Sequence, residues 1–277
     1  MEKINHIDVM NKNGYVLIGN FLEKRLINDV LNNILSFANI FRKKIVSRDS
    51  IPSKMIKNVD DLSQFLIWLD KYNNQYLFSF VSLVSSLYKI KQLCYNDIFI
   101  KKASELLFIS DEELLCGEIS FLVNTPESKR LIYHWHNAKN YYPKREKHIN
   151  FWVPIIIDKT KNNGTLEMAK GSHLNDYPFL EFQGPTDKNK KGNLTQNLIP
   201  DYYVKDFDIE KLECKVGSFA AILPKTVHSG SLNQSSECSY VLVFKIWANH
   251  KDWTLSSNLS QKYFEGDIGS GSDITII

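Results

Sequence analysis

The 277-residue sequence has few cysteines, no strong excess of charge and no long apolar run. Its 34 basic and 31 acidic residues leave a net charge of +3, so no broad basic face for nucleic acid is expected. The four cysteines are scattered and form no CxxC pair. This argues against a zinc knuckle or a disulfide scaffold and fits a reducing cytosol. The longest apolar runs are far too short to span a membrane.

The N-terminal stretch MEKINHIDVMNKNGYVL also lacks the charged-then-apolar pattern of a signal peptide. These absences together predict a soluble cytoplasmic protein with no membrane or nucleic-acid partner. A hydrophobic content of 43% is enough for a substantial core. We expect one domain over residues 1–265, followed by a flexible tail at 266–277 with the sequence GDIGSGSDITII.

The first part of the chain, about residues 20–110, has the periodicity of helices. A short β-type run at 14–18 precedes it. From about residue 23 to 40, apolar side chains recur at spacings of three and four, which places them on one helix face. Further helical patterns are centred on three segments. They cover residues 62–69, 78–88 and 98–108.

The pattern changes near Leu114, where short strand-like runs begin to alternate with turns rich in Gly and Asn. Many short strands of this kind favour an antiparallel barrel or jelly roll. A long polar connection at 176–213 interrupts them, and loops of that length are usually functional covers. The predicted strands are 119–123, 131–135, 149–157, 165–169, 219–223 and 240–247.

The stretch YHWHNAKNYY holds the first candidate site. His134 and His136 are one residue apart on a predicted strand, so both would point to one face with Trp135 opposite. His228 follows the apolar run that ends at Leu223. Two histidines plus one on a β-scaffold suit Fe(II), with zinc or nickel as alternatives. Each could instead be a hydrogen-bonded core histidine, and for His134 alone that reading is favoured.

Several segments, taken in order, resemble the phytanoyl-CoA dioxygenase family. They are NGYVLIGNFL, HNA, INFWVPIIIDKTKNNGTLEMAKGSH, KVGSFAAILP and HSGSLNQS, and together they extend from about residue 14 to 247. The resemblance implies a mostly β fold with N-terminal helices, a double-stranded β-helix of the jelly-roll or cupin-like kind. It also implies an Fe(II)- and 2-oxoglutarate-dependent oxygenase acting on a small molecule.

The sequence departs from the family's motif at two positions. The family binds iron with an HxD pair and a distant His, which map to His136 and His228, but the Asp position is Ala138. An Arg eleven residues after the distant His usually holds the far carboxylate of 2-oxoglutarate, and here that position is Ser239. Lys245 lies six residues further along the same predicted strand and could supply a point charge instead of the planar fork.

Two further residues, Asn137 and Trp152, match family positions near the cosubstrate, and Tyr141 and Tyr142 would form an aromatic rim. The missing carboxylate leaves three alternatives open. Related halogenases have Ala or Gly at the Asp position, which frees a coordination site for chloride. His134 could complete a three-His site. The chain could also be a catalytically diverged member that binds a ligand or partner in the old cavity. We predict an oxidoreductase that uses Fe(II), with 2-oxoglutarate binding weakened by Ser239.

Overall fold

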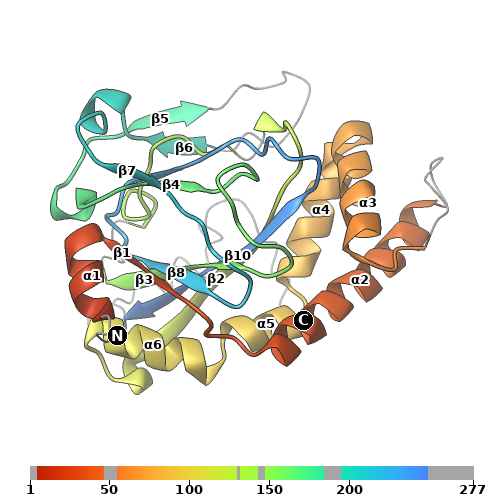
Figure 1. The fold of residues 1–277 in the computed structure, drawn as a ribbon, viewed down its shortest axis with the longest axis horizontal. Helices are drawn as coiled ribbons and strands as arrows, with labels where there is room; N and C mark the ends of the chain where they lie inside the picture. Colours follow the sequence, from red (N-terminus) through yellow and green to blue (C-terminus); the bar gives the residue numbers. More distant parts are fainter. Residues whose placement is uncertain (1–4, 47–54, 130–131, 143–146, 184–194, 249–277) are drawn as a thin grey trace, which may run out of the picture.

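A computed structural model describes residues 5–46, 55–129, 132–142, 147–183 and 195–248 (Figure 1). The expected tail at 266–277 and the domain boundary at 265 lie outside these ranges. Two antiparallel sheets form the centre of the fold, and helices cover one side of it. Within the described residues, no helix is long and apolar enough to cross a membrane.

The larger sheet has five strands in the order β1-β8-β3-β10-β2. The second sheet has three strands in the order β7-β4-β9, and β5 pairs only with β6. In Figure 1 the larger sheet lies between the second sheet and the helices α5 and α6. The strands are β1 Tyr15–Ile18, β2 Leu114–Asn124, β3 His148–Pro154, β4 Leu166–Ala169, β5 Leu180–Gln183, β6 Thr195–Leu198, β7 Ile209–Lys211, β8 Phe219–Ile222, β9 His228–Gly230 and β10 Ser239–Ala248.

Side chains on the larger sheet alternate between two cores, because successive residues of a strand point to opposite faces. On β3, Ile149 and Phe151 join the core beneath the helices, whereas Trp152 joins the core between the two sheets. Asn150 shares the parity of Trp152 and therefore also faces the second sheet. This inner face of the larger sheet forms one wall of the candidate site.

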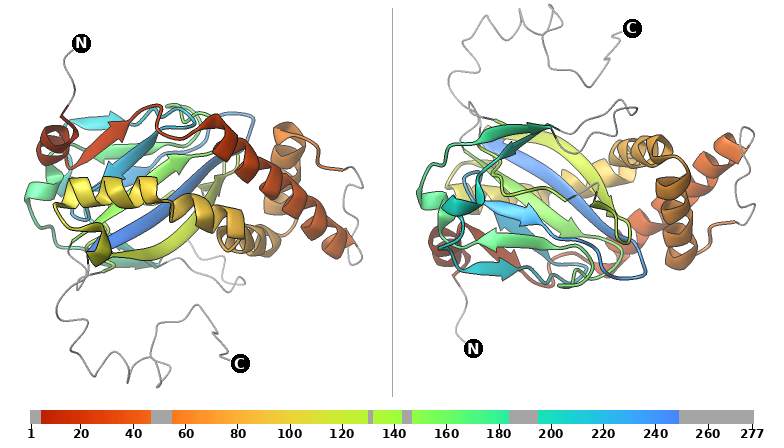
Figure 2. Two further views of the ribbon diagram at one scale, coloured as in Figure 1. Left: turned by 90° about the horizontal axis from the view of Figure 1, so that it is seen from below. Right: turned by 90° about the horizontal axis from the view of Figure 1, so that it is seen from above.

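The helices lie across the outer face of the larger sheet (Figure 2, left). Phe99 of α6 anchors them, with ring centroids 4.9–5.2 Å from Phe151, Phe219 and Phe244. Asparagine side chains cap α1, α3, α4 and α6 by accepting backbone N–H bonds. The helices are α1 His6–Asn13, α2 Lys24–Val46, α3 Val59–Tyr72, α4 Asn74–Ser85, α5 Tyr88–Cys94 and α6 Asp97–Leu107.

The predicted elements agree with this fold, with two main exceptions. No strand forms at 132–135, where one was expected. The chain there meets β9 of the second sheet through an isolated bridge between His136 and His228 and through a bond from the amide of Gly230 to the carbonyl of Tyr133. The expected polar loop at 176–213 instead contains β5, β6 and β7. These strands of three or four residues are too short to show a clear alternation. Two short helices, α1 and α5, were not expected from the sequence.

Candidate metal centre

The backbones of His136 and His228 hold each other in register. The amide of His136 donates to the carbonyl of His228 at 3.0 Å, and the amide of His228 donates to the carbonyl of His136 at 2.9 Å. This exchange is a hydrogen-bonded antiparallel pair, in which the two side chains lie on the same face. The two imidazole centroids are accordingly only 4.3 Å apart. The structure thus brings the two candidate metal ligands side by side.

Both rings are fixed in the same way. The Nδ1 of His136 lies 2.6 Å from the carbonyl oxygen of His134, and the Nδ1 of His228 lies 2.9 Å from that of Thr226. A carbonyl can only accept, so each ring carries its proton on Nδ1 and leaves the Nε2 lone pair exposed. Histidines that bind metals commonly have this second hydrogen bond, because it sets the tautomer and the ring orientation.

Electrostatics favour the same protonation state. Burial, and to a smaller extent the nearby His228, lower the pKa of His136 to about 3. Burial also lowers the pKa of His228. Both imidazoles are therefore neutral at pH 7, and a neutral imidazole is the form that binds a metal.

Aromatic side chains border the pair. The ring of Tyr141 meets His136 edge-on with centroids 5.9 Å apart, and its hydroxyl accepts from the amide of Asn197 at 3.0 Å. The hydroxyl of Tyr142 donates to Glu118 at 2.6 Å. Of the two tyrosines of the predicted rim, Tyr141 contacts the pair and is tied by Asn197 to the β6 strand, whereas Tyr142 contacts His148 and Trp247.

Among the described residues, no third histidine or carboxylate joins the pair to complete a metal site. Ala138 is buried, with 8% of its surface exposed. His134 is exposed, and its expected common face with His136 is wrong because no strand forms there. Throughout the described residues, no group of three or more His, Cys, Asp or Glu side chains could hold a metal. The structure brings His136 and His228 together without His134.

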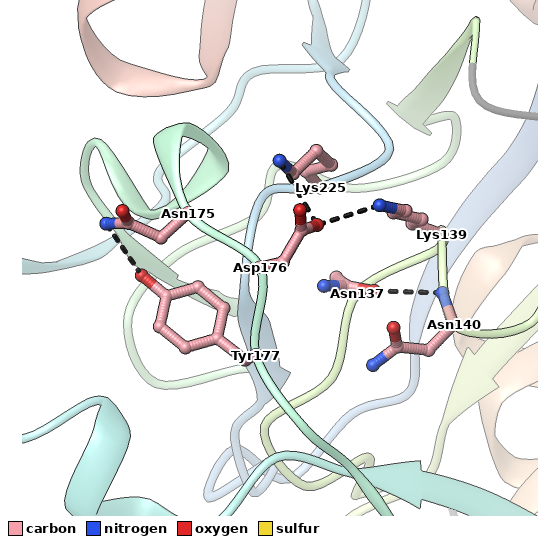
Figure 3. A network of polar contacts seen from close by, with 7 residues as sticks. All are labelled: Asn137, Lys139, Asn140, Asn175, Asp176, Tyr177 and Lys225. Atoms are coloured by element: carbon pink, nitrogen blue, oxygen red, sulfur yellow. Dashed lines mark hydrogen bonds and ion pairs between the residues drawn. The ribbon is translucent and has the colours of Figure 1, made fainter. Parts of the chain in front are cut away.

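A polar network joins the chain segments that follow His136 and precede His228 (Figure 3). Asp176 lies between Lys139 and Lys225, at 2.8 and 3.1 Å from their ammonium nitrogens. Lys139 follows His136 by three residues, and Lys225 precedes His228 by three, so Asp176 links the two histidine-bearing segments. The two lysines lower the pKa of Asp176. Asn137 has a local role here, since its buried side chain accepts from the amide of Asn140 at 3.0 Å.

Asn150 adds an unusual polar group to the inner face of the larger sheet. It is 6% exposed, and neither its side-chain oxygen nor its nitrogen has a hydrogen-bond partner among the described residues. Its neighbours in register are Ile222 on β8 and Lys245 on β10. Trp152, two residues further on, is buried at 5% exposure in the inner core. Buried carboxamides are seldom left without partners, so Asn150 is a candidate for contact with a ligand.

Comparison with known proteins places this geometry in a family. The sequence profile of phytanoyl-CoA dioxygenase (PhyH) matches residues 10–239. The chain belongs to the phytanoyl-CoA dioxygenase family. It is an enzyme family of the oxygenase type, as the sequence motifs predicted. A comparison with curated proteins gave no match.

Solved structures with the same fold support the jelly-roll prediction. The epimerase SnoN in complex with Fe3+, alpha ketoglutarate and nogalamycin RO has a TM-score of 0.57 at 13% identity, covering 97% of this chain and 91% of its own. The non-heme monooxygenase ThoJ has a TM-score of 0.55 at 14% identity, covering 88% and 77%. EctD from S. alaskensis with 2-oxoglutarate and 5-hydroxyectoine has a TM-score of 0.55 at 12% identity, covering 87% and 74%. These likenesses confirm the double-stranded β-helix fold.

Ser239, which stands where the family has its cosubstrate arginine, contacts Lys159, a residue that the sequence did not single out. Ser239 is fully buried at the start of β10, and its hydroxyl oxygen lies 2.5 Å from the ammonium nitrogen of Lys159. Lys245, the cation that the sequence suggested for this role, does not lie beside Ser239. Its ammonium lies 3.6 Å from Glu118 and 4.8 Å from the centre of the Tyr142 ring. Six strand residues separate it from Ser239, which corresponds to about 20 Å.

Proposed function

We propose that this protein is a non-haem Fe(II) oxygenase acting on a small molecule, with His136 and His228 as metal ligands. The observation that carries the proposal is the shared geometry of the two rings. Both Nδ1 atoms are bonded to backbone carbonyls, and the ring centroids are 4.3 Å apart. Two nitrogens that share a metal at about 2.1 Å each must lie within roughly 4 Å of each other, and this pair can satisfy that limit.

Two of the three protein ligands of the family's metal site are present, namely the two histidines. Two neutral imidazoles suit Fe(II), and Ala138 leaves the position of the third protein ligand to a water or an anion. In this family the metal with 2-oxoglutarate and dioxygen supplies an oxidant for a C–H bond. The chain's own residues would orient the substrate, hold the imidazoles neutral and limit access of water.

Several residues suit contact with a polar small molecule. The unpartnered carboxamide of Asn150 offers both a donor nitrogen and an acceptor oxygen to a hydroxyl or amide group. Lys245 and Glu118 form an ion pair at 3.6 Å and so present both charges next to Tyr142. The structures of SnoN and EctD contain small molecules, which supports a small-molecule substrate here.

A cytoplasmic location is part of the same proposal. All four cysteines lie in the described part of the chain, and all are free thiols. Burial raises the pKa of Cys214 and Cys238 to about 12, so these thiols stay protonated and unreactive. Free buried thiols fit a reducing compartment.

Uncoupled turnover tests the function without knowledge of the substrate. The protein would be loaded with Fe(II) without oxygen, then given 2-oxoglutarate and dioxygen, and succinate would be measured. We expect slow Fe(II)-dependent succinate formation that His228→Ala abolishes. Succinate formation that survives His228→Ala would exclude this metal centre. Metal uptake without any succinate would favour the diverged member that binds a ligand and does not oxidise it.

The buried Ala138 supports a second candidate, a halide-using variant of the same centre. Its methyl group takes little space where a carboxylate would bind the metal, which leaves room for chloride. Chloride should then perturb the spectrum of the metal-loaded protein, and Ala138→Asp should remove that effect. A spectrum indifferent to chloride would favour water at this position and the hydroxylating oxygenase.

A further inference from the structure

Lys159 is a buried lysine beside Ser239, the first residue of β10. It lies between β3 and β4, is 2% exposed, and its backbone pairs with Cys214. Its ammonium donates to Ser239 Oγ at 2.5 Å and to the carbonyls of Gly164 at 2.7 Å and Asn163 at 3.3 Å. No carboxylate of the described residues is among its partners.

A buried lysine with only neutral partners is costly. Moving an ammonium group out of water is unfavourable unless an opposite charge or strong hydrogen bonds compensate for it. A neutral side chain could join the turn at Gly164 to β10 without that cost. The arrangement is therefore better explained by an anion that binds beside Lys159.

The surroundings of Lys159 correspond to one particular part of the proposed site. Ser239 shares the parity of Val241, which lies in the core between the two sheets, so its hydroxyl faces the barrel interior. Ser239 is also the position at which the family usually has the arginine for the far carboxylate of 2-oxoglutarate. Hence the position that lost the guanidinium is contacted by an ammonium from another segment.

The turn that carries Lys159 is built to hold it there. Gly164 has a φ of +78°, a conformation that favours glycine, and a Cβ at this position would lie 2.6 Å from the side-chain nitrogen of Asn124. The carbonyl of Gly164 accepts from both Asn124 and Lys159. The 3.3 Å bond to Asn163 is the longest of the three made by the ammonium, so it is the one that a carboxylate would most easily replace.

We propose that Lys159 binds the distal carboxylate of a 2-oxo dicarboxylate in place of the missing arginine. Ser239 positions the ammonium, since its hydroxyl accepts from Lys159 and donates to the carbonyl of Asn163 at 2.5 Å. This inference rests on the proposed function, because the other end of such a ligand would lie at the metal. The positive charge has moved from β10 to the segment between β3 and β4. Lys245, paired with Glu118 about 20 Å along the strand from Ser239, has no part in this contact.

The test compares two ligands on the nickel-loaded protein by calorimetry. 2-Oxoglutarate has the distal carboxylate, whereas pyruvate keeps the 2-oxo acid group and lacks it. We expect Lys159→Met to weaken 2-oxoglutarate binding about ten- to a hundredfold, toward the affinity of pyruvate, and to leave pyruvate binding unchanged. Lys161→Met removes an exposed lysine two residues away; it is the matched control and should bind 2-oxoglutarate as the wild type does.

A charge-relocation variant separates binding from folding. Lys159→Met combined with Ser239→Arg returns the cation to β10 and should restore much of the 2-oxoglutarate affinity. If Lys159→Met alone does not fold, this double variant and the wild-type preference for 2-oxoglutarate over pyruvate carry the test. Thermal unfolding of each variant shows which of them are folded.

The outcomes are distinguishable. Nickel binding, measured first, reports on the proposed metal centre alone. If nickel binds and the wild type does not prefer 2-oxoglutarate over pyruvate, the role of Lys159 is overturned while the metal centre stands. Unchanged 2-oxoglutarate affinity in Lys159→Met also overturns it. If nickel does not bind, both proposals fail together.

Discussion

The main-chain hydrogen bonds between His136 and His228 set the separation of the two imidazoles. They form an isolated bridge, because the residues before His136 do not form a strand. The ring positions therefore depend on one backbone pair, on two Nδ1–carbonyl bonds and on the Asp176 link between Lys139 and Lys225. This amount of support is consistent with a site that keeps its geometry before metal binds.

Adding the missing carboxylate should strengthen metal binding. Ala138→Asp places a negative oxygen ligand where the family has one, and we expect Fe(II) affinity to rise by about tenfold or more. Ala138→Asn has nearly the same shape without the charge and should give little gain. Anaerobic titration of Fe(II) into the three proteins measures this. An unchanged or lower affinity in Ala138→Asp would mean that the open position is built for a different ligand, such as chloride.

The buried carboxamide of Asn150 should lower the stability of the fold, as expected of a residue kept for ligand binding. Its carboxamide is buried without a protein partner, so Asn150→Leu should raise the free energy of unfolding by about 1–3 kcal/mol. Asn137→Leu is the contrasting variant, since it removes the bond to the amide of Asn140 and should lower stability. Urea unfolding measures both. A loss of stability in Asn150→Leu would show that its carboxamide already has a partner, such as a bound water.

Lys159 should make stability depend on pH in the alkaline range. Burial lowers its pKa to about 7 in the folded protein, from 10.5. Between those values the unfolded chain binds a proton that the folded chain does not, so stability should rise with pH, by at most about 1.4 kcal/mol per pH unit. Below pH 7 both states are protonated, and the full cost of the buried charge remains.

Urea unfolding from pH 6.5 to 9.5 tests this slope, with Lys159→Met as the comparison. The side-chain partners of Lys159 are a hydroxyl and two carbonyls, which do not titrate. The Cys214 thiol, on the paired segment, has its pKa raised by burial to about 12 and stays neutral in this range. The carboxylate of Asp158 accepts from the amide of Val216. Equal slopes in the two proteins would contradict a buried, titrating Lys159.

Local patterns predicted most of the fold. Apolar spacings of three and four gave the long helices, and short strand-like runs between turns gave β2, β3 and β10. The same logic failed at 131–135. There Tyr133, His134 and Trp135 alternate like a strand, but the bridge to β9 is confined to His136, with one further bond to the carbonyl of Tyr133. A one-residue bridge leaves no periodic signal.

The residues of the candidate site that belong to the family motif could be predicted from the sequence. They are His136, His228 and Ala138. Lys159 was not, because it stands in a polar turn that looks like surface. Its burial depends on Ser239, which is 80 residues away in the sequence. The one available signal was the missing arginine, which calls for another cation. Strand parity pointed to Lys245, but parity gives the face of a strand and not the position along it.

Metal binding by the histidine variants tests the proposed centre most directly. Nickel or anaerobic Fe(II) should bind the wild type at one ion per chain, measured by titration and elemental analysis. His136→Ala and His228→Ala should each abolish binding, whereas His134→Ala should retain it, because His134 is exposed and outside the bridged pair. Binding that survives His228→Ala, or a wild type that takes up no metal, would contradict a two-histidine centre, and loss of metal in His134→Ala would show a three-histidine site instead.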